Sequence, residues 1–141
     1  VDVRGAYLYA PLHEQIIVSA PPGFASTSNR TLQLRKALYG LRQSGRAWFE
    51  CISTFLNEHG FTSSEADVCV FTKTVNGSIS IVVILYVDDL VMTGPRASDI
   101  NNFEKIFKDR FEVSALNDLD VFIGIEVVRS PKGLELHQGA Y

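Results

Sequence analysis

The chain has 141 residues, 46% of them hydrophobic, and a net charge of −3, which is typical of one globular domain with its own core. Its 21% charged and 11% aromatic residues exclude a disordered chain, a collagen-like repeat and a disulfide-dense miniprotein. The apolar run 79–87 is too short to cross a membrane, and no secretory signal opens the sequence. Cys51 and Cys69 show no partner spacing, so we expect reduced core thiols in an intracellular protein.

The first part of the chain is predicted to contain short strands, a loop and one helix. Residues 1–12 are predicted as a strand that leads into a turn or short helix, and residues 16–18 and 31–34 as strands. The Pro, Gly, Ser and Asn residues of 20–29 indicate a loop. Apolar residues recur at helical spacing from Ser44 to His59, with Ser44 as the expected N-cap.

The second part is predicted to alternate hairpins and a helix. Residues 68–75 and 78–87 form a hairpin, because Asn76-Gly77 supplies the positive φ angles of a tight turn. This alternation lacks the regularity of a parallel sheet, so we expect an α+β fold with helices on one face of an antiparallel sheet. The other predicted elements are a strand at 90–92, a helix at 99–110 with Ile100, Phe103, Ile106 and Phe107 inward, and a hairpin of 121–128 and 134–136 joined by Pro131-Lys132-Gly133.

Asp88 and Asp89 are the strongest candidates for chemistry. Two adjacent carboxylates after an apolar strand repel each other and are partly desolvated, and a divalent cation such as Mg²⁺ or Mn²⁺ removes that cost. Asp2 lies in a second strand-like segment, and with it the pair would form a three-aspartate site for two metal ions. The alternative for the pair is an ordinary Asp-Asp turn.

The charge is distributed unevenly along the chain. Between Glu14 and Glu50 there are five Lys or Arg residues and no acid, so this stretch carries +5 and the remainder −8. Basic residues interleaved with Leu, Tyr and Trp can follow the phosphates of a nucleic acid. The alternative is a solvated surface, because five charges over so long a stretch are not dense.

Six short motifs, in this order, carry a family resemblance over essentially the whole chain. Together they resemble the reverse transcriptase of copia-type LTR retrotransposons. Each motif alone is weak, whereas six in register are specific, and the third and fifth favour the copia branch. The motifs are Asp2-Val3-Arg4-Gly5-Ala6-Tyr7-Leu8, Pro21-Pro22-Gly23-Phe24, Leu38-Tyr39-Gly40-Leu41-Arg42-Gln43-Ser44, Arg46-Ala47-Trp48, Tyr86-Val87-Asp88-Asp89 and Phe122-Ile123-Gly124-Ile125-Glu126-Val127.

The resemblance implies a role for each motif. Asp2, Asp88 and Asp89 match the catalytic aspartates, and the Val3 carbonyl matches a further ligand of two Mg²⁺ ions, which Mn²⁺ can replace. The positions implied to bind the incoming deoxynucleotide are Arg4, Gly5, Ala6, the steric-gate residue Tyr7, and Tyr39. Those implied to bind template or primer are Gly40, Arg42, Gln43, Tyr86, Val87, Phe122, Ile123 and Gly124. Without the motifs, Tyr7 and Trp48 read as core aromatics.

The implied architecture is the palm of a right-hand polymerase with part of its fingers. Residues 12–43 match the fingers, 1–11 and 44–120 the palm, and 121–141 the primer-grip hairpin. We therefore expect a piece of a Pol polyprotein, with further fingers and integrase upstream and a thumb and RNase H downstream. RNA template, DNA primer and deoxynucleotides are the implied partners, with no membrane, and the implied location is a cytoplasmic virus-like particle.

Three departures from the family pattern leave other functions open. Gly45 replaces a proline, Ala10-Pro11 replaces Gly-x, and Asn117-Asp118 replaces a Leu-Gly turn. None removes a catalytic carboxylate, but loss of the proline loosens the loop before the helix. The alternatives are an inert, decayed or domesticated nucleic-acid-binding remnant and an unrelated aspartate-based phosphohydrolase.

Overall fold

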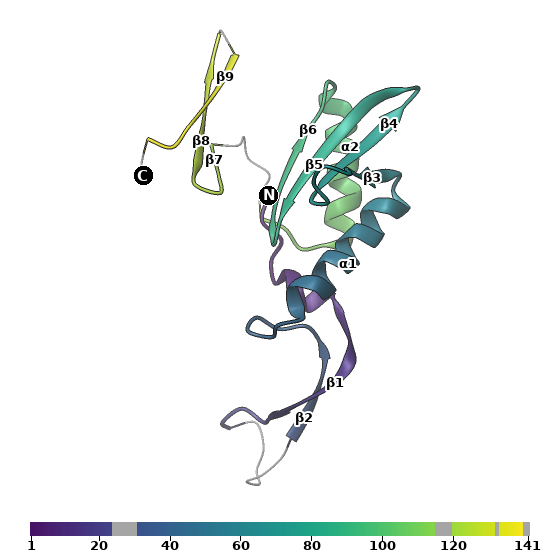
Figure 1. Ribbon diagram of the computed structural model, residues 1–141, viewed down its shortest axis with the longest axis vertical. Helices are drawn as coiled ribbons and strands as arrows, with labels where there is room; N and C mark the ends of the chain where they lie inside the picture. The colour runs from purple at the N-terminus through teal and green to yellow at the C-terminus, as the bar shows by residue number, and fades with distance from the viewer. Residues whose placement is uncertain (24–30, 115–119, 132, 140–141) are drawn as a thin grey trace.

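The computed structural model describes residues 1–23, 31–114, 120–131 and 133–139 (Figure 1). Antiparallel strands form three sheets, with the orders β1-β2, β3-β4-β5-β6 and β7-β8-β9. The helices are η1 (Ala6–Tyr9), α1 (Ser44–Glu58) and α2 (Ala97–Arg110). The strands are β1 (Pro11–Ser19), β2 (Thr31–Lys36), β3 (Phe61–Ser63), β4 (Val70–Val75), β5 (Ser78–Tyr86), β6 (Asp89–Thr93), β7 (Val121–Phe122), β8 (Ile125–Ser130) and β9 (Gly133–His137).

The four-stranded sheet has one well-buried face. Along β5, Ile81, Val83 and Leu85 are at most 4% exposed, whereas the alternating residues Val82 and Ile84 are only half-buried. Since successive side chains of a strand point to opposite faces, both α1 and α2 cover the same side (Figure 1). The predicted α+β arrangement of antiparallel strands and two helices is confirmed.

Aromatic rings fill the space between the helices and this sheet. Phe55 of α1 contacts Phe103 and Phe107 of α2 at ring-centroid distances of 6.3 and 5.8 Å. Phe111, directly after α2, lies 5.0 Å from Phe55 and 5.5 Å from Trp48. Offset and edge-on ring pairs of this kind contribute stability beyond the area they bury. Phe61 of β3 lies 4.6 Å from Phe103, and Phe71 of β4 lies 6.3 Å from Phe49 of α1, so both helices pack on the sheet that carries Asp88 and Asp89.

Most predicted elements are present, and five of them, β1, β2, β6, α2 and β9, are longer than predicted. The predicted strand 16–18 belongs to β1, which pairs with β2 in a two-stranded ribbon (Figure 1). The predicted hairpin is β4-β5, with Asn76 and Gly77 at φ 53° and 77°. Long helices with clear periodicity and an Asn-Gly turn are the local signals that need least tertiary information.

Four predictions about local structure are wrong, and one strand was not predicted. Residues 1–12 do not open with a strand but make two single bridges before η1, which is the short helix predicted there. Gln43 is the N-cap of α1, and the Ser44 hydroxyl donates to the Leu38 carbonyl instead. The remaining corrections are the unpredicted strand β3, the 40% exposure of Ile106, and the division of the predicted strand 121–128 into β7 and β8 by Ile123 and Gly124 at φ 51° and 74°.

Some predictions fall outside the described residues. They concern the loop residues 24–29, the Asn117-Asp118 departure and Lys132 of the last turn. Cys51 and Cys69 are free and half-buried, so they line the core edge rather than its centre. No helix in the described part of the chain is long and apolar enough to cross a membrane.

Candidate functional site

The turn between β5 and β6 carries the paired aspartates. Tyr86 at the end of β5 pairs with Asp89 at the start of β6, so Val87 and Asp88 form the tip. Val87 has φ 55°, a left-handed conformation that is strained for a β-branched residue. The indole Nε1 of Trp48, which is 1% exposed, donates to the Val87 carbonyl at 2.6 Å. Trp48 is thus a core residue, as predicted, that also holds the aspartate turn.

Asp2 is brought beside this turn by the backbone. It forms a single antiparallel bridge with Asp89, and the Val3 amide donates to the Asp88 carbonyl at 2.8 Å. Residues that the sequence separates by more than 80 positions therefore share one edge of the sheet. Partial burial raises the pKa of the Asp89 carboxyl, and the nearby charges of Asp88 and Asp2 raise it further.

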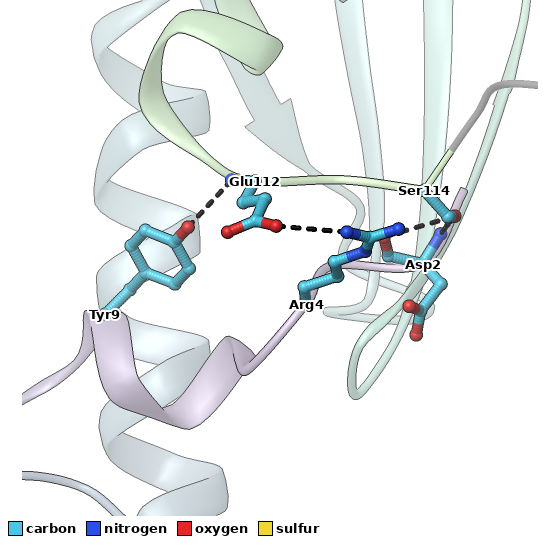
Figure 2. A network of polar contacts seen from close by, with 5 residues as sticks. All are labelled: Asp2, Arg4, Tyr9, Glu112 and Ser114. Atoms are coloured by element: carbon cyan, nitrogen blue, oxygen red, sulfur yellow. Dashed lines mark hydrogen bonds and ion pairs between the residues drawn. The ribbon is translucent and has the colours of Figure 1, made fainter.

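A polar network holds Asp2 from the other side (Figure 2). The Asp2 amide donates to the Ser114 hydroxyl at 3.0 Å, and the Ser114 amide donates to the Asp2 carbonyl at 2.9 Å. Arg4 forms an ion pair with Glu112 at 3.1 Å, and the Glu112 amide donates to the Tyr9 hydroxyl at 2.7 Å. The segment after α2 thus serves as a backbone partner for the segment that carries Asp2.

Tyr7 and Tyr39 form a second group beside the turn. Their rings lie 4.3 Å apart with an interplanar angle of 40°. The Tyr39 hydroxyl donates to Oδ2 of Asp88 at 2.9 Å. Desolvation of the hydroxyl, together with this hydrogen bond and the charge of Asp88, raises the pKa of Tyr39 to about 12. The tyrosine is therefore a neutral donor near pH 7.

The oxygen donors at this edge are of the kind that Mg²⁺ or Mn²⁺ prefers. Asp2, Asp88 and Asp89 supply carboxylates, and Val3 supplies a backbone carbonyl. In the described part of the chain, however, no three acidic, His or Cys side chains converge on one point as a metal cluster. The backbone brings the three aspartates together, while their carboxylates do not form a completed cage.

The other predicted nucleotide contacts lie next to Asp2. Gly5 has φ 62° at the start of η1, a left-handed conformation in which glycine is unstrained, and Ala6 is fully buried. Arg4 is exposed and its guanidinium is engaged by Glu112. Arg4, Gly5 and Ala6 therefore all lie on the segment that directly follows Asp2.

The predicted template and primer contacts fall into three groups. Gly40 and Arg42 are exposed in the loop before α1, and Gln43 donates to Glu14 of β1 at 2.9 Å. Tyr86 and Val87, 55% and 40% exposed, flank the aspartates directly. The third group, Phe122, Ile123 and Gly124, lies at the β7-β8 turn of the separate three-stranded sheet (Figure 1).

Three residues that support the site carry no signal in the sequence. Glu112 contacts Arg4 and Tyr9, and Ser114 contacts Asp2, each across more than 100 positions of sequence. Such contacts depend on how α2 returns to the sheet, and no local pattern encodes that return. For Trp48 the helical periodicity predicts burial, but it does not indicate the partner of the indole nitrogen.

Comparisons with known proteins agree with the family resemblance that the motifs indicate. The model of the family "Reverse transcriptase (RNA-dependent DNA polymerase)" matches residues 1–141. The Retrovirus-related Pol polyproteins from transposons RE2 and RE1 of Arabidopsis thaliana are each 37% identical over 143 aligned residues, covering 100% of this chain and 10% of the relative. The corresponding protein from transposon TNT 1-94 of Nicotiana tabacum is 29% identical over 92% of this chain and 10% of its own length.

The chain thus spans about a tenth of the length of these relatives. No solved structure matches it. The family model covers every residue, and the relatives come from copia-type transposons, so the predicted resemblance is confirmed. The chain belongs to the reverse transcriptase family of retrotransposon Pol polyproteins, of the copia type.

Proposed function

We propose that the chain supplies the palm and part of the fingers of an RNA-directed DNA polymerase. In this assignment residues 1–11 and 44–120 form the palm, 12–43 the fingers portion and 121–141 the primer-grip hairpin. The observation that carries the proposal is the backbone bridge between Asp2 and Asp89. It brings the first family motif to the Tyr-Val-Asp-Asp turn, which is the juxtaposition a shared carboxylate site requires.

The proposed metal ligands are Asp2, Asp88, Asp89 and the Val3 carbonyl. Two Mg²⁺ ions, when bound there, lower the pKa of a primer 3′-hydroxyl and neutralise the triphosphate and the departing pyrophosphate. The chain's own part is to hold the carboxylates: Trp48 fixes the turn through Val87, and Ser114 fixes the backbone of Asp2. The bond that forms joins the primer oxygen to the α-phosphorus, and the bond to pyrophosphate breaks.

The incoming deoxynucleotide is proposed to lie over the segment from Arg4 to Tyr7. Amides at Gly5 and Ala6 face its phosphates, and the Tyr7 ring lies under the sugar and excludes a 2′-hydroxyl. Support comes from the position of Tyr7, whose ring contacts Tyr39 and thereby lies beside Asp88. Tyr39 is proposed to line the same pocket.

Template and primer are proposed to follow the exposed residues on either side of the aspartates. Phosphate contacts from Arg42 position a strand without reading its sequence. The proposed template contacts are Gly40, Arg42 and Gln43, and the proposed primer contacts are Tyr86, Val87, Phe122, Ile123 and Gly124. The remaining proposed partners are the other parts of the Pol polyprotein, namely upstream fingers and integrase and downstream thumb and RNase H, in a cytoplasmic virus-like particle.

Primer extension on an RNA template by the polymerase that contains this chain tests the proposal. Asp88→Asn abolishes extension, because the neutral amide removes a metal-binding charge. Asp67→Asn is the matched control, since Asp67 is exposed and its Oδ1 accepts from the Cys69 amide at 2.8 Å, a bond that asparagine retains. Equal extension by both variants contradicts the site. Phosphoester hydrolysis without primer or template favours the phosphohydrolase, and inactivity of the unsubstituted polymerase favours the remnant.

A further inference from the structure

Tyr39 has an unusual combination of exposure and fixed contacts. Its side chain is 58% exposed, yet its ring packs on Tyr7 at 4.3 Å and its hydroxyl donates to Asp88 at 2.9 Å. It lies in the loop between β2 and α1, 49 positions before Asp88. Two specific contacts on an exposed tyrosine fix the orientation of the Asp88 carboxylate from outside the β5-β6 hairpin.

This hydrogen bond engages an oxygen that a metal ion could use. Oδ2 of Asp88 accepts from Tyr39, and this bond occupies one of the lone-pair sites through which the carboxylate could bind a cation. The three aspartates share one sheet edge, yet in the described part of the chain they form no converged cluster. The hydrogen bond from Tyr39 thus fixes one of these three carboxylates from a loop outside the sheet edge.

We propose that the Tyr39 hydroxyl is a latch on Asp88, which competes with a divalent cation for Oδ2 when the cation binds the aspartates. The inference rests on the proposed function, because it requires the three aspartates to be a metal site. Displacement of the hydroxyl frees Oδ2 and releases the Tyr39 ring from its fixed position. Since that ring packs on Tyr7, entry of the metal is coupled to the side chain proposed to discriminate sugars.

The latch makes Tyr39 a positioning residue whose removal strengthens binding. Tyr39→Phe keeps the ring and its contact with Tyr7 but removes the donor to Asp88. Because the cation no longer competes with a hydrogen bond to a carboxylate, we expect Tyr39→Phe to bind Mn²⁺ about 3- to 10-fold more tightly. A purely structural role would leave the affinity unchanged or weaken it.

Titration of the full chain with Mn²⁺ measures this affinity without nucleotide or nucleic acid. The free ion is monitored by electron paramagnetic resonance. The variants are Tyr39→Phe, Asp88→Asn and the double variant, and Asp67→Asn is the control outside the site. We expect tighter binding in Tyr39→Phe, weaker binding in Asp88→Asn, no gain from Tyr39→Phe when Asp88 is already Asn, and no change in Asp67→Asn. Thermal unfolding of each variant establishes that it is folded.

The outcomes separate the latch from the metal site. If the unsubstituted chain binds Mn²⁺ and Asp88→Asn weakens that binding, but Tyr39→Phe leaves it equal or weaker, the latch is wrong and the site stands. If Asp88→Asn binds as tightly as the unsubstituted chain, or none of the proteins binds Mn²⁺, the proposed metal site fails and the latch fails with it.

Discussion

The aspartate turn and the sheet β7-β8-β9 are held in different ways. The turn is fixed by Trp48, by the bridge from Asp2 and by packing of its strands on two helices. In the other sheet, large apolar side chains remain in solvent, with Leu134 66% and Leu136 68% exposed. This chain itself therefore holds the backbone around the aspartates, whereas the proposed primer-grip residues gain little support from the packing of the described residues.

The largest expected effect comes from the indole that holds the turn. Trp48→Ala removes a buried ring and the hydrogen bond to Val87, and we expect it to cost about 3–5 kcal/mol of unfolding free energy. Leu136→Ala, in the exposed face of β9, is the matched test of the other region and should stay within about 0.5 kcal/mol. Urea denaturation measures both, and comparable losses would break the contrast between the two regions.

A smaller effect is expected at Gly94, just after β6. A Cβ on Gly94 would lie 2.3 Å from the Ser80 carbonyl oxygen, so Gly94→Ala forces the β5-β6 hairpin to shift. We expect a loss of about 1–3 kcal/mol in chemical denaturation. Gly45→Ala is the control: its Cβ would meet only the Tyr7 hydroxyl, at 3.9 Å, and in the first turn of α1 it should add up to about 1 kcal/mol. A stabilising Gly94→Ala would contradict the described packing.

The proposed steric gate gives a prediction about specificity. Tyr7→Ala removes the ring that is proposed to lie under the sugar, and we expect ribonucleotide rejection to fall at least about tenfold, or about 1.4 kcal/mol of discrimination. Single-nucleotide incorporation with dNTP and rNTP pairs measures the ratio. Unchanged sugar discrimination in a polymerase that still extends primers refutes this role for Tyr7.

The smallest effect concerns acid stability at the start of α2. The hydroxyl of Ser80 and the guanidinium of Arg96 both donate to Asp99 and hold its pKa below the usual range. A depressed pKa in the folded state adds stability above the unfolded pKa of about 3.9, and this contribution is lost as the pH falls further. Asp99→Asn should therefore flatten the acid limb of a stability-against-pH curve. If the acid limb is unchanged in Asp99→Asn, the hydrogen bonds to Asp99 contribute nothing to the pH dependence of stability.

Local chemistry predicts much of this fold. The periodicity around Trp48 and the Asn76-Gly77 turn predicted α1 and the β4-β5 hairpin, because both signals act over a few residues. The prediction of one continuous strand over 121–128 is wrong, because Ile123 adopts a left-handed φ that its residue type disfavours. Likewise the inward orientation predicted for Ile106 failed, because periodicity defines a stripe on α2 but not where the sheet ends beneath it.

The sequence predicts which residues form the candidate site, but it does not predict the contacts that hold them in place. The motifs singled out Asp2, Asp88 and Asp89, and the fold brings their backbones to one sheet edge. The contacts of Tyr39 with Asp88 and of Ser114 with Asp2 depend on loops whose paths no spacing rule encodes. The first contact orients the Asp88 carboxylate and the second holds the backbone of Asp2. The sequence pattern could therefore identify the candidate ligands but not the contacts that position them.

The proposed function requires Asp2, Asp88 and Asp89 to form one metal site. Anomalous scattering from crystals of the chain soaked in Mn²⁺ tests this most directly, because the ion is located without assuming any activity. We expect anomalous density within about 2.0–2.2 Å of oxygens from Asp2 and from at least one residue of the Asp88-Asp89 pair. Ordered Mn²⁺ bound elsewhere, with these three carboxylates contacting no ion, would contradict it.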